Sequence, residues 1–203
     1  MENQRQIWEN IAPKWNKYRT RISPTVEKFL AEQKGEILDL GCGSGRNFMK
    51  AEGLNWHAID FSKKMIEFAK KKAEEIGIDL DAKVSKSDEL PFEENYFDSV
   101  LCFAVLHCID SKEKRKKTLE EIYRVLKNGG TALISSWGRN SPRLKNKEKE
   151  SVVPWTVKES EEKYMRYTYV FDLEELVYLC KEVGFEIVNF WEERNVNVVI
   201  RKN

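Results

Sequence analysis

Short apolar runs alternate with helix-like segments through the middle of this chain, and this alternation restricts the folds open to it. Runs that predict strands lie at residues 37–40, 56–59, 80–84, 99–105 and 131–135. Helical patterns lie between them at residues 62–77 and 111–126, and the glycine-rich turn after the first strand is expected to lead into another helix. Near-continuous apolar strands that alternate with helices predict a parallel sheet covered on both faces, the doubly wound α/β class.

Two segments break the alternation. Residues 1–35 are expected to form a helical lid, because apolar side chains recur at helical spacing from Ile7 to Tyr18 and Ser23-Pro24 starts a second helix. Residues 139–170 are charged and rich in aromatic side chains, and they contain two prolines. We interpret this second segment as an insertion over the carboxyl edge of the sheet, where it serves as a substrate lid.

The chain is expected to end in an antiparallel hairpin. Asp172 and Glu175 have the spacing of a capping box for a helix that stops at Gly184. Two short apolar runs follow, at residues 185–191 and 196–200, separated by a polar turn. The prediction is therefore one domain over residues 1–203, with a core at 36–136, a C-terminal helix and hairpin at 171–203, and a mostly parallel seven-stranded sheet.

The composition agrees with one globular domain. Of the 203 residues, 35 are basic, 34 are acidic and 41% are hydrophobic, which excludes disordered and collagen-like chains. The four cysteines form no CxxC pair, which indicates reduced thiols, no metal site and a cytoplasmic protein. No apolar run approaches the ~18 residues of a membrane span, so no membrane partner is expected. The net charge of +1 permits nucleic acid without demanding it, although basic side chains gather at residues 112–117 and 139–149.

A glycine-rich loop follows the first predicted strand, in the sequence Ile37-Leu38-Asp39-Leu40-Gly41-Cys42-Gly43-Ser44-Gly45. Ligands of open α/β sheets bind at the carboxyl ends of the strands, so this loop is expected to hold one. Arg46 stands where the dinucleotide fingerprint requires its third glycine, which disfavours an NAD-dependent dehydrogenase. Asp60, at the end of the second strand, is placed to accept hydrogen bonds from ribose hydroxyls. Taken singly, Asp39 and Asp60 equally fit a turn acceptor and a helix cap.

These signals, with Leu90-Pro91-Phe92, Phe97-Asp98 and the segment 126–130, resemble in order and spacing the motifs of class I S-adenosylmethionine-dependent methyltransferases. The resemblance implies that S-adenosylmethionine is the cofactor, with its methionine part along the glycine loop, its ribose on Asp60 and its adenine beside Phe61. The family's usual acid before the Leu90 motif is Lys86 here, so Ser87 or Asp88 is expected to take the adenine contact. The implied cofactor-binding residues are Asp39, Gly41, Cys42, Gly43, Gly45, Asp60, Phe61, Ser87, Asp88, Phe103 and Ala104.

The outer segments resemble a narrower family, the tRNA wobble-uridine methyltransferases that esterify 5-carboxymethyluridine. The similarity lies in four stretches: Ile11-Ala12 with Trp15, Arg19 and Pro24; Phe103 to His107; Val153-Pro154-Trp155; and Arg166 to Phe171. Cys108 and Thr168-Tyr169 depart from the family's pattern. The resemblance implies direct in-line methyl transfer to a carboxylate, which is already ionised at pH 7 and needs no general base. Arg19, His107 and Arg166 are the implied catalytic residues.

Partners follow from the same resemblance. The anticodon loop of tRNA is the implied substrate, with the aromatics of the insertion stacking on bases and the basic clusters on phosphates. A small zinc-binding activator protein is the implied heterodimer partner, and the strand at residues 80–84 is the expected edge for it. Two alternatives remain open, a methyltransferase for a small metabolite and a non-catalytic scaffold that binds the cofactor.

Overall fold

The computed structural model describes residues 3–142, 144, 146–156 and 162–203. Helices in this part of the chain are α1 (Gln4–Tyr18), α2 (Pro24–Leu30), α3 (Lys63–Ile76), η1, a single 3-10 turn (Leu106–Cys108), α4 (Lys112–Val125) and α5 (Leu173–Val183). The strands are β1 (Gly35–Leu40), β2 (Leu54–Asp60), β3 (Leu80–Val84), β4 (Phe97–Phe103), β5 (Leu126–Trp137), β6 (Glu150–Thr156), β7 (Lys163–Tyr169), β8 (Glu186–Glu192) and β9 (Asn195–Arg201).

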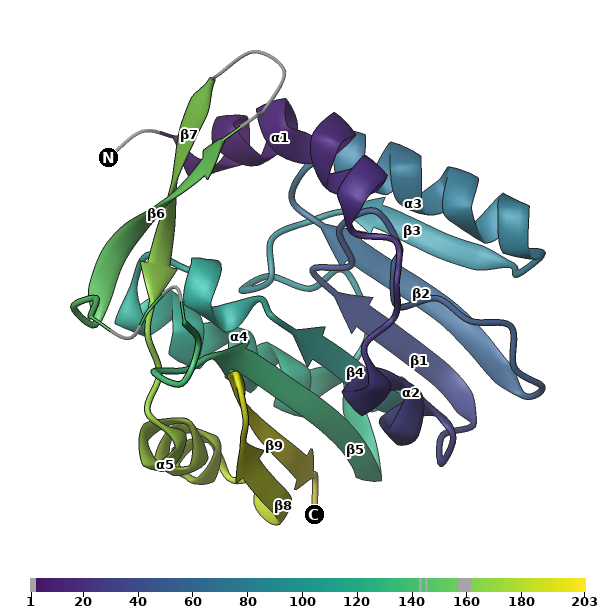
Figure 1. Ribbon diagram of the computed structural model, residues 1–203. Coiled ribbons are helices and arrows are strands. Elements are labelled where there is room, and N and C mark those ends of the chain that lie inside the picture. Colours follow the sequence, from purple (N-terminus) through teal and green to yellow (C-terminus); the bar gives the residue numbers. More distant parts are fainter. Residues whose placement is uncertain (1–2, 143, 145, 157–161) are drawn as a thin grey trace.

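The main sheet has seven strands in the order β3-β2-β1-β4-β5-β9-β8. β1 to β5 pair in parallel, whereas β9 runs antiparallel to both β5 and β8. The predicted doubly wound α/β class, with a terminal antiparallel hairpin, is confirmed (Figure 1). Because the strand order reverses between β1 and β4, a crevice forms beyond the carboxyl ends of these two strands.

Helices cover both faces of this sheet and form two apolar cores. On one face, α4 and α5 bury side chains such as Leu119 and Leu176 against β4, β5 and β9. On the other face, α2 and α3 bury Phe29 and Ile66 against β1 and β2. The central strands are apolar on both sides because both sides are covered, which explains their near-continuous apolar runs.

The helix expected after the glycine loop is not formed. Residues 44–47 make successive turns, with the Gly45 amide donating to the Cys42 carbonyl and the Phe48 amide to the Gly45 carbonyl. Gly41, Gly43 and Gly45 all have positive φ, which breaks a helical path, and the short segment before β2 has room for only about two helical turns. That prediction was wrong, and the loop leads through an irregular segment directly into β2.

The capping box expected at α5 does not form either. Asp172 occupies the N-cap position but its side chain accepts no hydrogen bond from the helix. Its carboxylate instead lies 2.9 Å from Arg139 Nε and 3.1 Å from Lys149 Nζ. Glu175 pairs with Lys149 at 2.8 Å and accepts a hydrogen bond from the Tyr169 hydroxyl. These ion pairs take the acceptors that a capping box would use, and they tie the insertion to α5.

The insertion forms a two-stranded antiparallel sheet, β6–β7, and α1 lies across the top of the molecule beside it (Figure 1). The Gln4 side chain accepts a hydrogen bond from the Tyr167 amide of β7 at 2.9 Å. At the next turns of α1, the Glu9 carboxylate accepts hydrogen bonds from the first two amides of α3, Lys63 N at 2.6 Å and Lys64 N at 3.2 Å. Helix α1 is therefore held at two points over the carboxyl edge of the sheet.

Candidate active site

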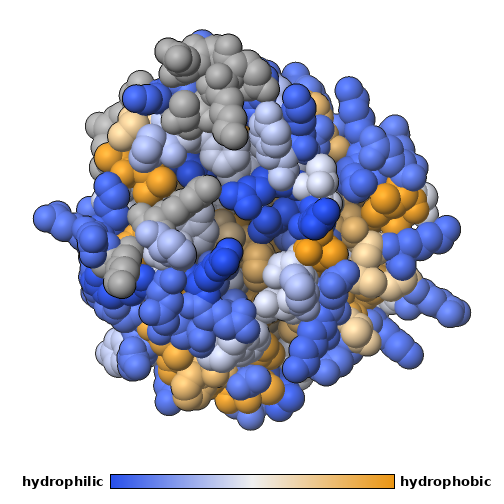
Figure 2. All heavy atoms as spheres, viewed as in Figure 1, coloured by the Kyte–Doolittle hydropathy of each residue, from blue (hydrophilic) through white to orange (hydrophobic). Residues whose placement is uncertain are grey.

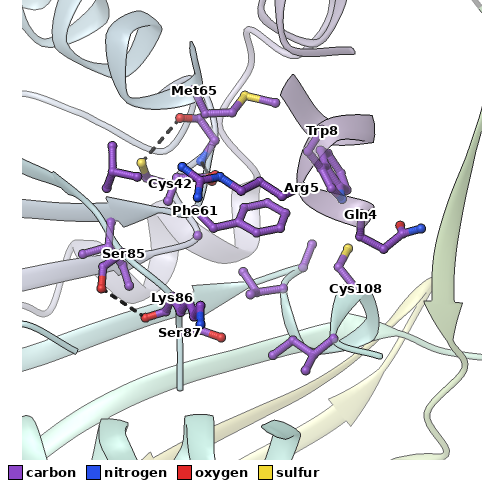
Figure 3. A pocket seen from close by; sticks show the side chains of 18 of the residues that line it. Gln4, Arg5, Trp8, Cys42, Phe61, Met65, Ser85, Lys86, Ser87 and Cys108 are labelled. Carbon is purple, nitrogen blue, oxygen red and sulfur yellow. Dashed lines mark hydrogen bonds between the residues drawn. The ribbon is translucent and has the colours of Figure 1, made fainter. Parts of the chain in front are cut away.

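A cavity of about 730 Å³ lies at the carboxyl edge, beneath α1. Figure 2 shows hydrophilic side chains over most of this face, surrounding a hollow near its centre. In Figure 3, Gln4, Arg5 and Trp8 project from α1 across from Ser85, Lys86 and Ser87. Nine of the eleven residues expected to bind the cofactor line this cavity: Gly41, Cys42, Gly43, Asp60, Phe61, Ser87, Asp88, Phe103 and Ala104.

Gly45 and Asp39 support the loop from behind the cavity lining. A Cβ on Gly45 would lie 2.6 Å from the Phe48 ring and 3.3 Å from Ala69 Cα of α3, so this glycine permits close packing of the loop on the helix. Asp39 is fully buried and accepts a hydrogen bond from Asn47 Nδ2 at 3.3 Å. Burial raises the pKa of Asp39 to about 7. Direct cofactor contact by these two residues remains a prediction.

Asp60 organises the loop while facing the cavity. One carboxylate oxygen accepts from the Gly43 amide at 3.0 Å, and the other accepts from the Ser62 amide at 2.9 Å. Burial raises the pKa of Asp60 to about 6, although these backbone hydrogen bonds act in the opposite direction. Each carboxylate oxygen has a further lone pair, so Asp60 can also accept from ribose hydroxyls.

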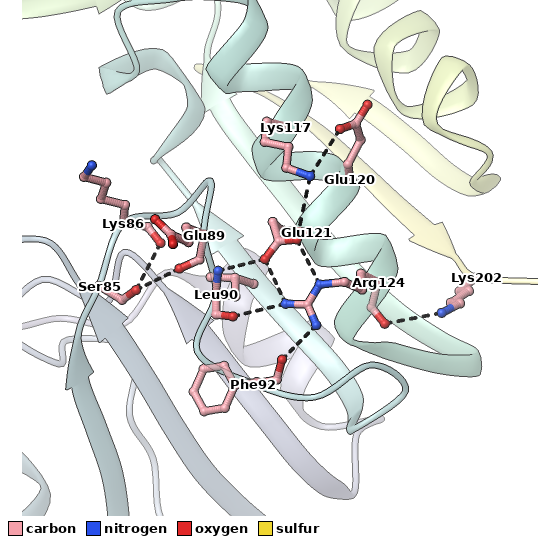
Figure 4. A network of polar contacts seen from close by, with 10 residues as sticks. All are labelled: Ser85, Lys86, Glu89, Leu90, Phe92, Lys117, Glu120, Glu121, Arg124 and Lys202. Carbon is pink, nitrogen blue, oxygen red and sulfur yellow. Dashed lines mark hydrogen bonds and ion pairs between the residues drawn. The ribbon is translucent and has the colours of Figure 1, made fainter.

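A polar network anchors the segment that follows β3 (Figure 4). The Leu90 amide donates to Glu121 of α4 at 2.8 Å, while Arg124 donates to the carbonyls of Leu90 at 3.1 Å and Phe92 at 2.8 Å. The Arg124 and Glu121 side chains are themselves paired at 2.8 Å. The Leu90 motif is thus fixed to α4, which positions residues 85–89 along the cavity wall.

The residues present fit S-adenosylmethionine. A Cβ on Gly41 would lie 2.5 Å from Val105 Cγ2, so the loop passes where only glycine fits and leaves room for a ligand beside it. Asp60 supplies the acceptor for a ribose, and Phe61 supplies an aromatic face beside it. Ser87 and Asp88 both line the wall near Lys86, with the Ser87 hydroxyl 3.0 Å from Thr118 Oγ1. Which of the two contacts the adenine remains a prediction.

A second cavity of about 640 Å³ adjoins the first. Its lining includes Trp8, Trp15, Arg46, Phe103 and Ala104, which also line the first cavity. The lining particular to the second cavity comes from four parts of the chain that meet at this edge: Arg19, Ser23, Pro24, Thr25, His107, Trp137, Glu193, Arg194, Asn195 and Asn197. Two of the three residues expected to be catalytic, Arg19 and His107, therefore lie together in a cavity beside the cofactor site.

His107 is neutral at physiological pH. Burial is the main cause that lowers the pKa of its imidazole to about 3, and the nearby Arg166 charge adds to the shift. The ring stacks on Trp137 at a centroid distance of 4.5 Å. Its Nδ1 atom is buried without a hydrogen-bond partner among the described residues, so the ring offers a polar atom to a ligand of this cavity.

Arg166, the third expected catalytic residue, lines neither cavity. Its guanidinium is buried among four indole rings, at 5.2 Å from Trp155, 5.5 Å from Trp8, 5.6 Å from Trp137 and 6.0 Å from Trp15. We call this arrangement the tryptophan cage. Cation–π contacts of this kind join α1, β5, β6 and β7 around one charge. A catalytic role for Arg166 remains a prediction, and its contacts indicate a positioning role.

Two expectations about tRNA contacts change with the structure. Tyr167 and Tyr169 of the insertion are buried, so they are not available to stack on bases. Lys114, Lys116 and Lys117 of the first basic cluster pair with acidic side chains, and Arg115 is buried against the ring of Tyr169. In the second cluster, Arg139 and Lys149 pair with Asp172, while Arg143 and Lys145 lie outside the described residues. Internal pairing reduces the positive charge that these clusters offer to phosphates.

Sequence reasoning missed several lining residues. Trp8 and Trp15 are seven positions apart on α1, and this spacing is typical of the apolar face of an ordinary helix. Arg194 belongs to the β8–β9 turn, whereas Asn195 and Asn197 lie at the start of β9, which runs antiparallel to β5 with Asn195 opposite Trp137. Because β9 is antiparallel, the polar turn before it reaches the carboxyl edge of the sheet. The predicted hairpin could have indicated this placement of the turn, because the start of an antiparallel last strand lies beside the carboxyl ends of the parallel strands.

The strand order, the glycine loop and Asp60 at the end of β2 together define a class I methyltransferase domain. The family described as "Methyltransferase domain" matches residues 38–134. A mouse protein named probable tRNA methyltransferase 9B is 27% identical over 151 residues, which cover 73% of this chain and 32% of that protein. The chain thus spans about a third of the length of this relative. A Schizosaccharomyces pombe protein named tRNA (carboxymethyluridine(34)-5-O)-methyltransferase is 26% identical, covering 98% of this chain and 95% of its own.

Solved structures share the fold. A putative methyltransferase from Haloferax volcanii, solved in complex with the Trm112 methyltransferase activator, superimposes with a TM-score of 0.73 over 98% of this chain and 97% of that chain, at 19% identity. Residues 38–134 therefore carry a class I S-adenosylmethionine-dependent methyltransferase domain, with S-adenosylmethionine as its cofactor, and the chain is similar to tRNA methyltransferases. No helix in the described residues is both long and apolar enough to cross a membrane.

Proposed function

We propose that this chain transfers a methyl group to the carboxylate of 5-carboxymethyluridine at the wobble position of tRNA. The observation that carries the proposal is the second cavity, which adjoins the cofactor site and is lined by Arg19, Arg46 and Arg194. A cavity lined by three arginines, one glutamate (Glu193) and a neutral histidine has an excess of positive charge, which suits an anionic acceptor. The names of similar proteins support the same acceptor.

The chemistry asks this chain mainly for positioning. Bound S-adenosylmethionine supplies a sulfonium-activated methyl group. The acceptor carboxylate, with a pKa near 4, is ionised at pH 7, so the chain needs no general base. Arg19 orients the carboxylate through its planar fork of donors, and Trp8 and Trp15 exclude water where the two cavities meet. His107 stays neutral in this cavity and contributes a hydrogen bond to the acceptor rather than a charge.

The test uses labelled S-adenosylmethionine and total tRNA, with and without a candidate zinc-binding partner, followed by digestion to nucleosides. The expected product is a labelled 5-substituted uridine whose label is released by mild base, as an ester requires. Matched RNAs that carry either 5-carboxymethyluridine or its amide show whether the carboxylate is the group that accepts the methyl. Label in neither RNA, with cofactor binding intact, would contradict the proposed acceptor.

A small zinc-binding activator is the proposed partner, and a heterodimer in the cytoplasm is the proposed working form. Strand β3 is an edge of the main sheet, and Val84 at its end is 46% exposed. An unpaired edge with apolar side chains suits strand addition. The structurally similar Haloferax volcanii protein was solved in complex with the Trm112 methyltransferase activator, which supports a protein partner. Co-expression should raise the soluble yield and the methyl transfer rate, whereas an equally active protein on its own would argue against the partner.

A small-molecule acceptor is the second candidate. The second cavity, at about 640 Å³, has the size of sites that enclose metabolites. Its three arginines would then hold a small carboxylic acid instead of a nucleotide. Methyl transfer to free carboxylic acids, with no label in tRNA under either condition, would favour this candidate.

A further inference from the structure

Arg115, in the first turn of α4, carries a buried charge and lines neither cavity. Its Nη1 atom donates two hydrogen bonds, to the Ile109 carbonyl at 2.8 Å and to the Tyr167 hydroxyl at 3.2 Å. The guanidinium lies over the Tyr169 ring at 3.9 Å. The carboxylate that pairs with it, on Glu150, is largely exposed and lies 3.9 Å from Nη2. A carbonyl, a hydroxyl and an aromatic ring therefore stabilise most of this charge.

The first of these partners, Ile109, belongs to the wall of the cofactor cavity. Cys108, Ile109 and Asp110 line that cavity in succession. His107, one position earlier, lines the second cavity instead. The hydrogen bond from Arg115 to the Ile109 carbonyl therefore fixes the chain directly after η1, where the wall passes from one cavity to the other.

The second partner, Tyr167, connects the same guanidinium to the roof of the cofactor cavity. Tyr167 is buried in β7 and lines neither cavity. Its hydroxyl accepts from Arg115 of α4, and its amide donates to the Gln4 side chain of α1 at 2.9 Å. Gln4 in turn lines the cofactor cavity. Figure 1 shows β7 running from beside α1 towards α4. A continuous path of contacts thus joins the wall at Ile109 to the roof at Gln4.

We propose that Arg115 is a positioning residue for the cofactor, which holds the wall at Ile109 and the roof at Gln4 in one arrangement through Tyr167. A cofactor enclosed between wall and roof binds with full affinity only while both are in place. When the two separate in part of the molecules, the apparent affinity falls in proportion to the fraction that remains closed. This role concerns the cofactor alone, so its test is independent of the proposed acceptor.

Calorimetry and stopped-flow dissociation of S-adenosylhomocysteine test this role without RNA. Tyr167→Phe removes only the hydroxyl that Arg115 binds, so S-adenosylhomocysteine should dissociate about 3- to 10-fold faster and bind more weakly by the same factor. Arg115→Met removes both hydrogen bonds and should have an effect of about 10- to 100-fold. Arg115→Lys, which keeps the charge, should recover part of the loss. Because both residues act through one path, adding Tyr167→Phe to Arg115→Met should cause no further loss.

The matched control is Leu119→Ala, on the same helix. Leu119 is fully buried and lines neither cavity, so its variant should lower the melting temperature and leave the dissociation rate unchanged. Wild-type dissociation rates in Tyr167→Phe and Arg115→Met would overturn the inference, because the contacts would then serve stability alone. Equally fast dissociation in Leu119→Ala would overturn it as a general effect of destabilisation. If Arg115→Met does not fold, the rates of Tyr167→Phe and Arg115→Lys decide in the same way.

Discussion

Ala104 adopts a left-handed backbone conformation, with φ at 63°, directly after β4 and in the lining of both cavities. This conformation costs an L-residue about 1 kcal/mol relative to glycine. Ala104→Gly should therefore raise the free energy of unfolding by about 1 kcal/mol, which raises the melting temperature by about 2–4 °C. Thermal denaturation measures this shift. Ala132→Gly, within β5, should have the opposite effect, and a destabilised Ala104→Gly protein would refute the strain.

Asp60 gives cofactor binding a pH dependence whose direction follows from its raised pKa. The free protein takes up a proton on Asp60 near pH 6. Ribose hydroxyls bind the ionised carboxylate better, so the affinity for S-adenosylhomocysteine should be full above this pKa and fall as the pH drops below about 6. Calorimetry across this pH range measures the affinity. The control variant Asp39→Asn should show the same loss of affinity below about pH 6. Asp60→Asn should bind about 10- to 100-fold more weakly at neutral pH and lose this dependence.

At the scale of elements, α1 covers the cofactor cavity, and the Glu9 hydrogen bonds to α3 are among its attachments. Its carboxylate caps the first amides of α3, where a negative charge is also favoured by the helix dipole. Glu9→Ala should release this end of α1 and increase the dissociation rate of S-adenosylhomocysteine about tenfold. Stopped-flow dissociation and faster amide exchange in α1 would both report it. The exposed Glu74→Ala in α3 is the control, and an unchanged rate in Glu9→Ala would exclude a lid role for this contact.

The elements also separate what the sequence could predict from what it could not. The parallel strands were predictable because burial on both faces leaves continuous apolar runs, as in residues 37–40 and 99–103. The absence of a helix after Gly45 was not predictable, because the local pattern does not show how few residues separate the loop from β2. The capping box at Asp172 failed because Arg139 and Lys149 come from an insertion whose path no local pattern specifies.

The candidate site also contains residues whose positions the sequence predicted and residues whose positions it did not. Nine of eleven expected cofactor residues line the cavity because the motif lies on one strand end and its loop. Arg166 was expected at the acceptor and is enclosed instead by indoles from α1, β5 and β6. The contacts with Trp8 and Trp15 join residues more than 100 positions apart, and only the folded chain brings them together.

For the whole molecule, the tryptophan cage joins the lid, the insertion and the main sheet around Arg166. Arg166→Ala should remove these contacts and leave a void, lowering the free energy of unfolding by about 2–4 kcal/mol. Thermal denaturation should show a loss of about 5–12 °C. Arg139→Ala, which breaks an exposed ion pair, should cost less than about 1 kcal/mol. Lost methyl transfer in an Arg166 variant of unchanged stability would instead support direct catalysis.

The hydrogen bond between Gln4 and the Tyr167 amide links the first helix to a strand near the other end of the chain. During synthesis, α1 leaves the ribosome before α3, to which Glu9 attaches it, and α3 leaves well before β7 does. Strands β1 to β5 and the glycine loop are therefore made before this contact can form, whereas α5, β8 and β9 follow β7. The contact between α1 and β7 therefore forms late, and we expect it to slow the exchange of cofactor only once the last third of the chain has been made.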